Sequence, residues 1–174
     1  MIKMTTELFE KFSKKQEELD SMIREKFGIS EVEWKGEKLS IKHGLALQVK
    51  KFEFINECHD SWKYWKKKSV VPERIIDEAI DVIHFIHLTL NKHEFKSVDF
   101  VNSINGDLEE LYDRIHEVDM LDLIGLLAEE LNVFRLYMLL LTILDHYAFT
   151  LDDIEQAYDR KNAENHARQK RGTY

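Results

Sequence analysis

The sequence predicts an all-α protein in which residues 1–174 form a single domain. Two features of the composition favour helices over a sheet with many tight turns: there is one proline, and there are six glycines. The third observation is that apolar residues recur at helical spacing along most of the chain. Hydrophobic residues make up 44% of the sequence, so a chain of this length can bury a sizeable core.

The first half of the chain contains three predicted helices. Apolar spacing predicts the first over residues 5–27, where Gly28 stops it and a connecting loop follows to about residue 41. The second is predicted from Leu45 to about Lys66. Pro72 opens the third, which runs to about Asn91, because a proline is tolerated in the first turn of a helix.

The second half is less regular. The pattern loosens from residue 92 to 107, with Gly106 as a break, and residues 107–118 predict a short amphipathic helix. Residues 119–147 predict one long helix or two, so apolar that either a subunit interface or a core position would explain them. Thr150, followed by acidic residues in the next turn, predicts the start of a last helix.

Two acids interrupt the otherwise apolar helix that Pro72 opens. Glu78 and Asp81 lie three residues apart, so they share one helix face, and that face is expected to point inward. Burying unpaired carboxylates is costly, so the pair predicts a bound cation or a basic partner. Glu53, on the preceding helix, could add an oxygen ligand for a hard cation. His84 and His87 are a weaker metal-site alternative, because no cysteine or third histidine lies at a zinc-like spacing.

Polar residues that could bind an anionic ligand with a ring lie in three other segments. Lys161, Asn165 and Arg168 fall on one stripe of the last helix, so they either face something anionic or form a solvated end. Residues 62–68 combine aromatic rings with four lysines, which suits either a phosphate-bearing ligand or a solvated loop. Gln16 lies within an apolar stripe, either at its edge or with its amide facing a pocket.

The composition also limits the partners and the location. A formal net charge of −8 makes nucleic acid an improbable partner. Cys58 is the single cysteine, which suits a reducing compartment such as the cytoplasm. The most apolar run, 133–144, contains Arg135 and is shorter than the roughly 20 residues of a membrane helix. We therefore expect a cytoplasmic protein without a membrane or nucleic-acid partner.

Four short segments occur in the order found in one known family. They are Glu53 with Asn56-Glu57, Trp62-Lys63-Tyr64-Trp65, Glu78-Ala79-Ile80-Asp81 with His84-Phe85, and Lys161-Asn162-Ala163-Glu164-Asn165-His166-Ala167-Arg168-Gln169 with Gly172 and Tyr174. Together they resemble the dimeric all-α dUTP pyrophosphatases (dUTPases), within the all-α NTP pyrophosphatase superfamily. The resemblance implies a helical bundle that forms a homodimer.

The resemblance also implies an activity and a set of site residues. The activity is Mg²⁺-dependent hydrolysis of dUTP to dUMP and pyrophosphate, by attack of water on the phosphate chain. The implied Mg²⁺ ligands and catalytic residues are Glu53, Glu78 and Asp81. The implied substrate-binding residues are Lys63, Lys161 and Arg168 for the phosphates, Gln16, Trp65, Phe85 and Asn165 around the uracil and deoxyribose, and Asn56. The preference for one base is less well defined, because the amides of Gln16 and Asn165 could pair with uracil or cytosine by rotating.

Lys50 departs from the family pattern. It lies three residues before Glu53, where the family has the first Glu of an E-x-x-E pair, a metal ligand that orients the attacking water. A lysine can do neither, and its ammonium would repel a metal ion. The alternative function is therefore a catalytically impaired, dUTPase-like nucleotide-binding or regulatory protein. A third hypothesis, from the apolar 119–147 region, is a structural helical interaction module.

Overall fold

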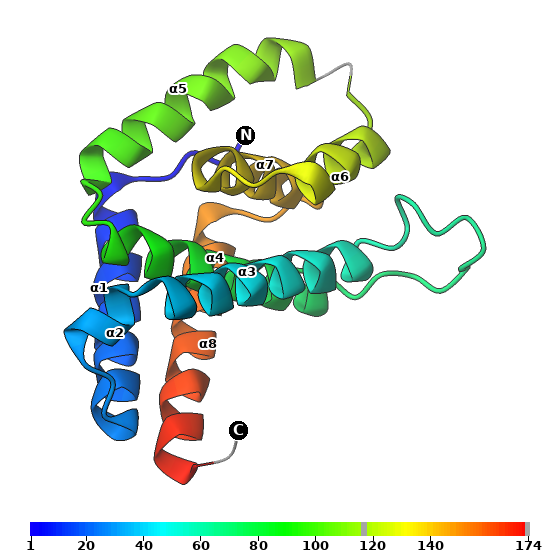
Figure 1. Cartoon of the computed structure of the whole chain (residues 1–174). Coiled ribbons are helices and arrows are strands. Elements are labelled where there is room, and N and C mark those ends of the chain that lie inside the picture. Colours follow the sequence, from blue (N-terminus) through cyan, green and yellow to red (C-terminus); the bar gives the residue numbers. More distant parts are fainter. Residues whose placement is uncertain (116–117, 173–174) are drawn as a thin grey trace.

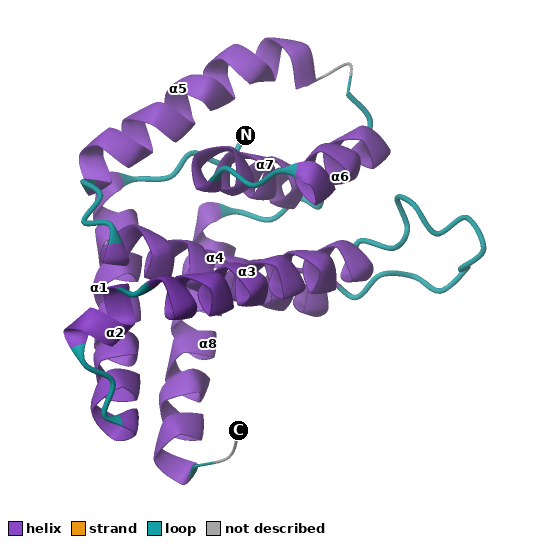
Figure 2. Cartoon of the chain, in the orientation of Figure 1, coloured by secondary structure: helices purple, strands orange, loops and turns teal. Residues whose placement is uncertain are grey.

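The computed structural model describes residues 1–115 and 118–172, with side chains described outside 110–115. Eight helices and no strand occur in these ranges, which confirms the all-α prediction (Figure 2). The helices are α1 (Thr6–Phe27), α2 (Glu31–Lys35), α3 (Glu37–Glu57), α4 (Pro72–Lys92), α5 (Ser97–Ile115), α6 (Met120–Glu129), α7 (Val133–His146) and α8 (Leu151–Arg171).

The predicted start and stop signals are in place at three helices. Gly28 ends α1 with φ at 61°, in the left-handed region that glycine adopts without strain. Pro72 occupies the first turn of α4. At α8 the hydroxyl of Thr150 accepts a hydrogen bond from the backbone of Asp153, whose carboxylate accepts one from the backbone of Thr150. This reciprocal cap satisfies backbone donors that the first turn of a helix leaves free.

Helix α4 lies at the centre of the fold and contacts α1, α3, α7 and α8 (Figure 1). Its buried side chains occur on nearly every face, which is why its sequence is apolar almost all round. Helix α3 runs along one side of α4, and α1 and α8 run side by side across it (Figure 1). Polar side chains in the middle of α4, such as Asp81 and His84, are therefore directed at neighbouring helices, whereas Glu73 and Arg74 in its first turn are exposed.

Two predicted boundaries in the first half were wrong. The predicted loop over 28–41 contains α2 and the first turn of α3, because Ser30 and Glu33 form a capping box that starts a helix there. Helix α3 ends at Glu57 rather than near Lys66. Residues 58–71 instead form a loop that projects from the ends of α3 and α4 (Figure 1).

The second half also required correction. Helix α5 runs through Gly106, so the predicted break was wrong; a single glycine costs a helix only about 1 kcal/mol. Of the helix predicted over 107–118, residues 107–115 belong to α5, residues 116–117 lie outside the described ranges, and Val118 is not helical.

The apolar segment 119–147 forms two helices, α6 and α7, and Asn132 caps the second. Residues 136–144 of α7 are buried in the core, so the core explanation applies to them. No single described helix is long and apolar enough to cross a membrane; α7 and α8 would qualify by length and composition only as a pair bent by 113°.

Candidate functional site

Three carboxylates from α3 and α4 surround the ammonium of Lys50. Its Nζ lies 2.7 Å from Oε2 of Glu53, 3.0 Å from Oδ2 of Asp81 and 3.9 Å from Oε2 of Glu78. From α8, Nζ of Lys161 lies 2.9 Å from the other carboxylate oxygen of Asp81. We call these five side chains the acid cluster. The predicted inward-facing acids, Glu78 and Asp81, thus have basic partners. These partners are two lysines from other helices, Lys50 of α3 and Lys161 of α8.

Burial and charge act in opposite directions in the acid cluster. Burial raises the pKa of Glu78, and the negative charge of Asp81 raises it further, while Lys50 and Lys161 oppose both effects. Burial lowers the pKa of Lys50, but its hydrogen bonds to Glu53 and Asp81 and the nearby negative charges outweigh burial and raise the pKa overall. Lys50 therefore carries a full positive charge at neutral pH.

The acid cluster has the donors that a hard divalent cation prefers. Carboxylate oxygens are the usual protein ligands of Mg²⁺, and the buried Oε2 of Glu78 has no hydrogen-bond partner among the described residues. The three carboxylates, however, are arranged around the ammonium of Lys50. Within the described part of the chain, no three acidic, histidine or cysteine side chains stand close enough to hold a metal ion. The donor set therefore fits Mg²⁺ only once Lys50 has left the position between the carboxylates.

A partly open cavity of about 220 Å³ lies beside the acid cluster and is lined mainly by α1, α4 and α8. It is lined by Gln16, Asp81, Phe85, Asn165 and Arg168, all predicted as site residues from the sequence. Lys50 also lines it, so Asp81 and Lys50 belong both to the cavity and to the acid cluster. The structure thus brings together residues that are up to 152 positions apart in the sequence, from Gln16 to Arg168.

Gln16 is buried, so of its two alternatives the pocket-facing one applies. Its Nε2 donates a hydrogen bond to Oδ1 of Asp20 at 2.8 Å, and its Oε1 lies 2.7 Å from Nδ1 of His84. The amide oxygen must accept, so Nδ1 of His84 carries the proton. Burial lowers the pKa of His84 to about 4, which keeps its ring neutral. Gln16 is therefore held in one orientation rather than free to rotate.

Asp20 also lines this cavity and was missed in the sequence. The available signal was its position four residues after Gln16, which puts both side chains on one face of α1. Burial raises the pKa of Asp20 to about 7, and its Oδ2 is buried without a hydrogen-bond partner in the ranges described. A buried carboxyl with a strongly raised pKa in a cavity is typical of a functional site.

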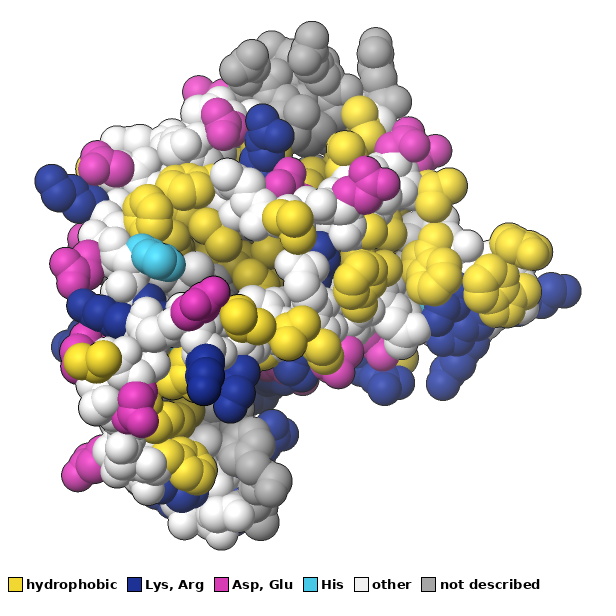
Figure 3. All heavy atoms as spheres, in the orientation of Figure 1, with side chains coloured by type: hydrophobic (Ala, Val, Ile, Leu, Met, Phe, Trp, Pro, Cys, Tyr) yellow, Lys and Arg dark blue, Asp and Glu magenta, His cyan; other side chains and the backbone are white. Residues whose placement is uncertain are grey.

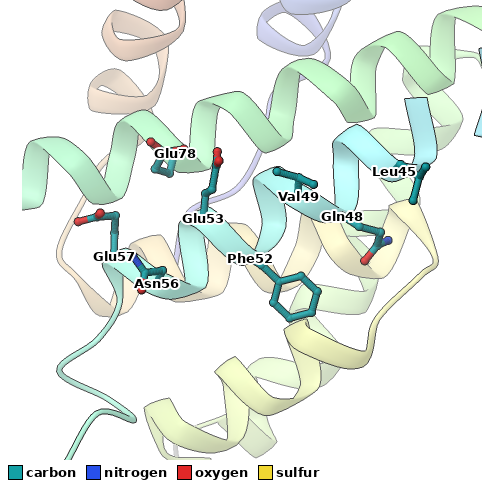
Figure 4. Close-up of a pocket in the computed structure, with 8 residues that line it drawn as sticks. All are labelled: Leu45, Gln48, Val49, Phe52, Glu53, Asn56, Glu57 and Glu78. Carbon is teal, nitrogen blue, oxygen red and sulfur yellow. The ribbon is translucent and has the colours of Figure 1, made fainter. Parts of the chain in front are cut away.

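Four of the predicted substrate-binding residues do not line the cavity: Lys161, which belongs to the acid cluster, and Asn56, Lys63 and Trp65. Asn56 lines a second, more open groove of about 630 Å³ along α3, together with Glu53 and with Glu78 of α4, which Figure 4 shows next to each other. Lys63 donates a hydrogen bond to the side chain of Asn56. Trp65 is 63% exposed on the 58–71 loop, so the structure does not bring its ring to the cavity.

The two histidines considered as metal ligands are buried in the core. His84 stacks on Tyr158 and bonds to Gln16, while Nδ1 of His87 lies 2.8 Å from the hydroxyl of Ser13. Packing and these hydrogen bonds account for both rings, except that Nε2 of His84 is buried without a hydrogen-bond partner among the described residues. Tyr174, the last residue of the C-terminal motif, lies outside the described ranges.

Comparison with known proteins gave one result. A protein-family model described as dUTPase matches residues 8–173. This range includes every residue of the acid cluster and of the cavity lining. Comparison with curated proteins and comparison with solved structures each gave no match.

Proposed function

The chain belongs to the dimeric all-α dUTPase family, and on that basis we propose that it hydrolyses dUTP to dUMP and pyrophosphate. The observation that carries this proposal is the adjacency of the cavity and the acid cluster, which share Asp81 and Lys50. A pyrimidine ring needs a concave space with a few fixed polar groups, and a triphosphate needs cations beside it. The two adjacent sites offer both.

In this proposal the uracil and deoxyribose occupy the cavity. The amides of Gln16 and Asn165 and the ring of Phe85 line it and would contact the base and sugar. The phosphate chain would extend over the acid cluster, where Lys161 and Arg168 supply positive charge. Asn56 lines the groove that contains Glu53 and Glu78, and Lys63 of the 58–71 loop bonds to it, so these two side chains would contact the phosphate chain from that groove.

Glu53, Glu78 and Asp81 would hold Mg²⁺ once Lys50 has withdrawn. When bound, the ion neutralises phosphate charge and lowers the pKa of a coordinated water. The protein side chains position the substrate. The fixed Gln16 amide orients the base, and Lys161 and Arg168 align the phosphates for in-line attack by water.

A second candidate function is nucleotide binding with impaired hydrolysis. It is favoured by one observation, the contacts of Lys50 with all three carboxylates. An ammonium in that position neutralises the groups that would attract a metal ion, and it cannot activate water as a metal does. The two candidates share the nucleotide site and differ in whether the bond is broken.

Pyrophosphate release from dUTP, dCTP, dTTP and UTP with Mg²⁺ tests both candidates. The chain should be compared with Lys50→Glu, which restores the E-x-x-E pair, and with Lys42→Glu, a matched charge reversal at an exposed position of α3. Selective release from dUTP by the unaltered chain supports the enzyme. Release only by Lys50→Glu supports impaired hydrolysis. Absence of release from all three proteins contradicts the enzyme proposal.

We also propose a homodimer in the cytoplasm, with no membrane or nucleic-acid partner. The support for a dimer is an exposed apolar stripe on α3, formed by Leu45, Val49 and Phe52, with exposed Leu126 on α6. Figure 3 shows apolar side chains gathered over the middle of this face. An exposed apolar area of this kind is typical of an interface between subunits.

A further inference from the structure

We propose that Lys50 binds the phosphate chain of the substrate, and that in the absence of nucleotide its ammonium excludes divalent metal from the acid cluster. When dUTP occupies the cavity, Lys50 moves from the carboxylates to the phosphates, and the cluster becomes able to bind Mg²⁺. This inference rests on the proposed nucleotide site, but it concerns metal binding rather than hydrolysis.

The first support is the position of Lys50 between the two parts of the site. Its ammonium contacts Glu53 and Asp81 at hydrogen-bond distance, and its side chain also lines the cavity. A lysine ammonium on a four-carbon chain can move between two anionic partners that lie on either side of it. A phosphate group beside the cavity would be such a second partner.

The second support is that Lys50 is not held by the core. Its side chain is 30% exposed, and every partner that it has among the described residues is a carboxylate of the acid cluster. The next residue shows the contrast: Lys51 is 1% exposed, and its ammonium donates to the backbone carbonyls of Ala128 and Glu130, both at 2.9 Å. Lys51 is a structural lysine, whereas Lys50 can leave its partners without breaking helix packing.

The third support is the charge balance. With Lys50 in place, two ammoniums face three carboxylates, so little negative charge remains to attract a divalent cation. Without it, Lys161, which pairs with Asp81, is the one cation left in the acid cluster, and the buried Oε2 of Glu78 is available as a ligand. A triphosphate attracts Lys50 strongly, because lysine is a common phosphate ligand. Nucleotide and metal should therefore bind cooperatively, and each should tighten the other by the same factor.

Titration with Mn²⁺, followed by electron paramagnetic resonance and calorimetry, tests this coupling. The nucleotide probe is α,β-imido-dUTP, which is not hydrolysed, and its own affinity for Mn²⁺ is measured separately and subtracted. For the unaltered protein we expect weak Mn²⁺ binding alone and at least tenfold tighter binding with the analogue. Lys50→Gln should bind Mn²⁺ without nucleotide at least tenfold more tightly than the unaltered protein, with most of the coupling lost.

Two further variants serve as controls. Lys50→Arg keeps the positive charge, so it should still exclude Mn²⁺ in the absence of nucleotide. Lys42→Gln removes a charge from an exposed position of the same helix, so it should behave like the unaltered protein. Thermal melting establishes that each variant is folded.

Several results would overturn the inference. These are Mn²⁺ binding to the unaltered protein as tight as to Lys50→Gln, a coupling that Lys50→Gln leaves unchanged, or no Mn²⁺ binding to Lys50→Gln. If the expected coupling appears without any pyrophosphate release, the inference holds and the hydrolytic proposal fails. If the analogue does not bind at all, both fail together.

Discussion

The amide oxygen of Gln16 lies 2.7 Å from Nδ1 of His84, so the first helix of the chain is tied to the central one at the wall of the cavity. The ring of His84 stacks on Tyr158 of α8 at 4.3 Å, and the hydroxyl of Tyr158 donates to the backbone carbonyl of Phe12 on α1. These contacts link the three helices that mainly line the cavity. The orientation of the Gln16 amide is therefore determined by tertiary structure.

His84→Phe should weaken base selection. The substitution keeps an aromatic ring against Tyr158 but removes the donor to Gln16, so the amide can rotate and present either its oxygen or its nitrogen to the base. We expect the ratio of dCTP to dUTP dissociation constants to move several-fold toward one. The free energy of unfolding should fall by about 1–3 kcal/mol, because a buried acceptor loses its partner. Calorimetric titration with both nucleotides and chemical denaturation measure these effects.

His87→Phe is the matched control for that variant. His87 is also buried on α4 and also has one short hydrogen bond, to Ser13, but it does not line the cavity. The His87→Phe variant should therefore be less stable than the unaltered protein but show the same base preference. An unchanged preference in His84→Phe would contradict the orienting role of this histidine.

Asp20→Asn should stabilise the protein at neutral and alkaline pH. Burial, the largest effect, raises the pKa of Asp20 from its ordinary value of 3.8 to about 7, and the hydrogen bond from Gln16 only partly opposes this. The fold therefore favours the protonated form, so the contribution of Asp20 to stability is greatest below pH 3.8 and is lost as the pH rises to about 7. Each unit of pKa shift corresponds to roughly 1.4 kcal/mol.

The measurement is the free energy of unfolding of both proteins at pH 5 and pH 8. The free energy of unfolding of the variant should exceed that of the unaltered protein by more at pH 8 than at pH 5, because asparagine does not ionise. Glu18→Gln, an exposed charge removal on the same helix, should show no such dependence. Equal pH profiles for Asp20→Asn and the unaltered protein would mean that Asp20 titrates normally.

The parts of the fold that were predicted correctly are those that local sequence determines. Helices α1, α4 and α8 have clear caps or stops, and their apolar spacing is regular, so their existence and most of their ends follow from short segments. Helix α5 was missed in part because Gly106 suggests a break that long-range packing overrides. The end of α3 was missed because the aromatic residues of the 58–71 loop continue the helical apolar pattern.

The residues of the site were likewise predictable where local sequence marks them, whereas their contacts were not. Glu78 and Asp81 were predictable because they interrupt an apolar helix, and Lys50 was recognisable as a departure from a motif. That Lys50 contacts all three carboxylates depends on how α3 packs along α4, and the contact of Lys161 with Asp81 depends on where α8 crosses α4. Neither packing geometry is encoded in a local pattern. The sequence therefore indicated which residues to examine but not that a lysine fills the cation position.

Lys161→Gln should reduce nucleotide affinity. The Lys161 side chain is 17% exposed, and its ammonium lies 2.9 Å from Asp81, at the edge of the site where the phosphates are proposed to lie. Removing the charge should raise the dissociation constant of α,β-imido-dUTP by roughly tenfold, which corresponds to about 1.4 kcal/mol. Calorimetry in EDTA measures this without interference from metal. Lys170→Gln, exposed on the same helix, should bind as the unaltered protein does, and equal losses in the two variants would show only a general charge effect.

Phe52→Glu should dissociate the proposed homodimer. Phe52 is 53% exposed and lies on one stripe of α3 with Leu45 and Val49, so a charge there would be buried against the partner without a counter-ion. Within one chain the position already faces solvent, so the fold and the melting temperature should change little. Light scattering at micromolar concentration should give a dimer for the unaltered protein and a monomer for the variant.

Val32→Glu provides the comparison for the dimer prediction. Val32 is 83% exposed on α2, away from the α3 stripe, so this variant should remain dimeric. If Phe52→Glu also remains dimeric, the interface lies elsewhere on the surface. If the unaltered chain is itself a monomer, then the α3 stripe needs another explanation. Because Glu53 and Glu78 line the same groove as Phe52, a partner seated there would also limit access of solvent to the acid cluster.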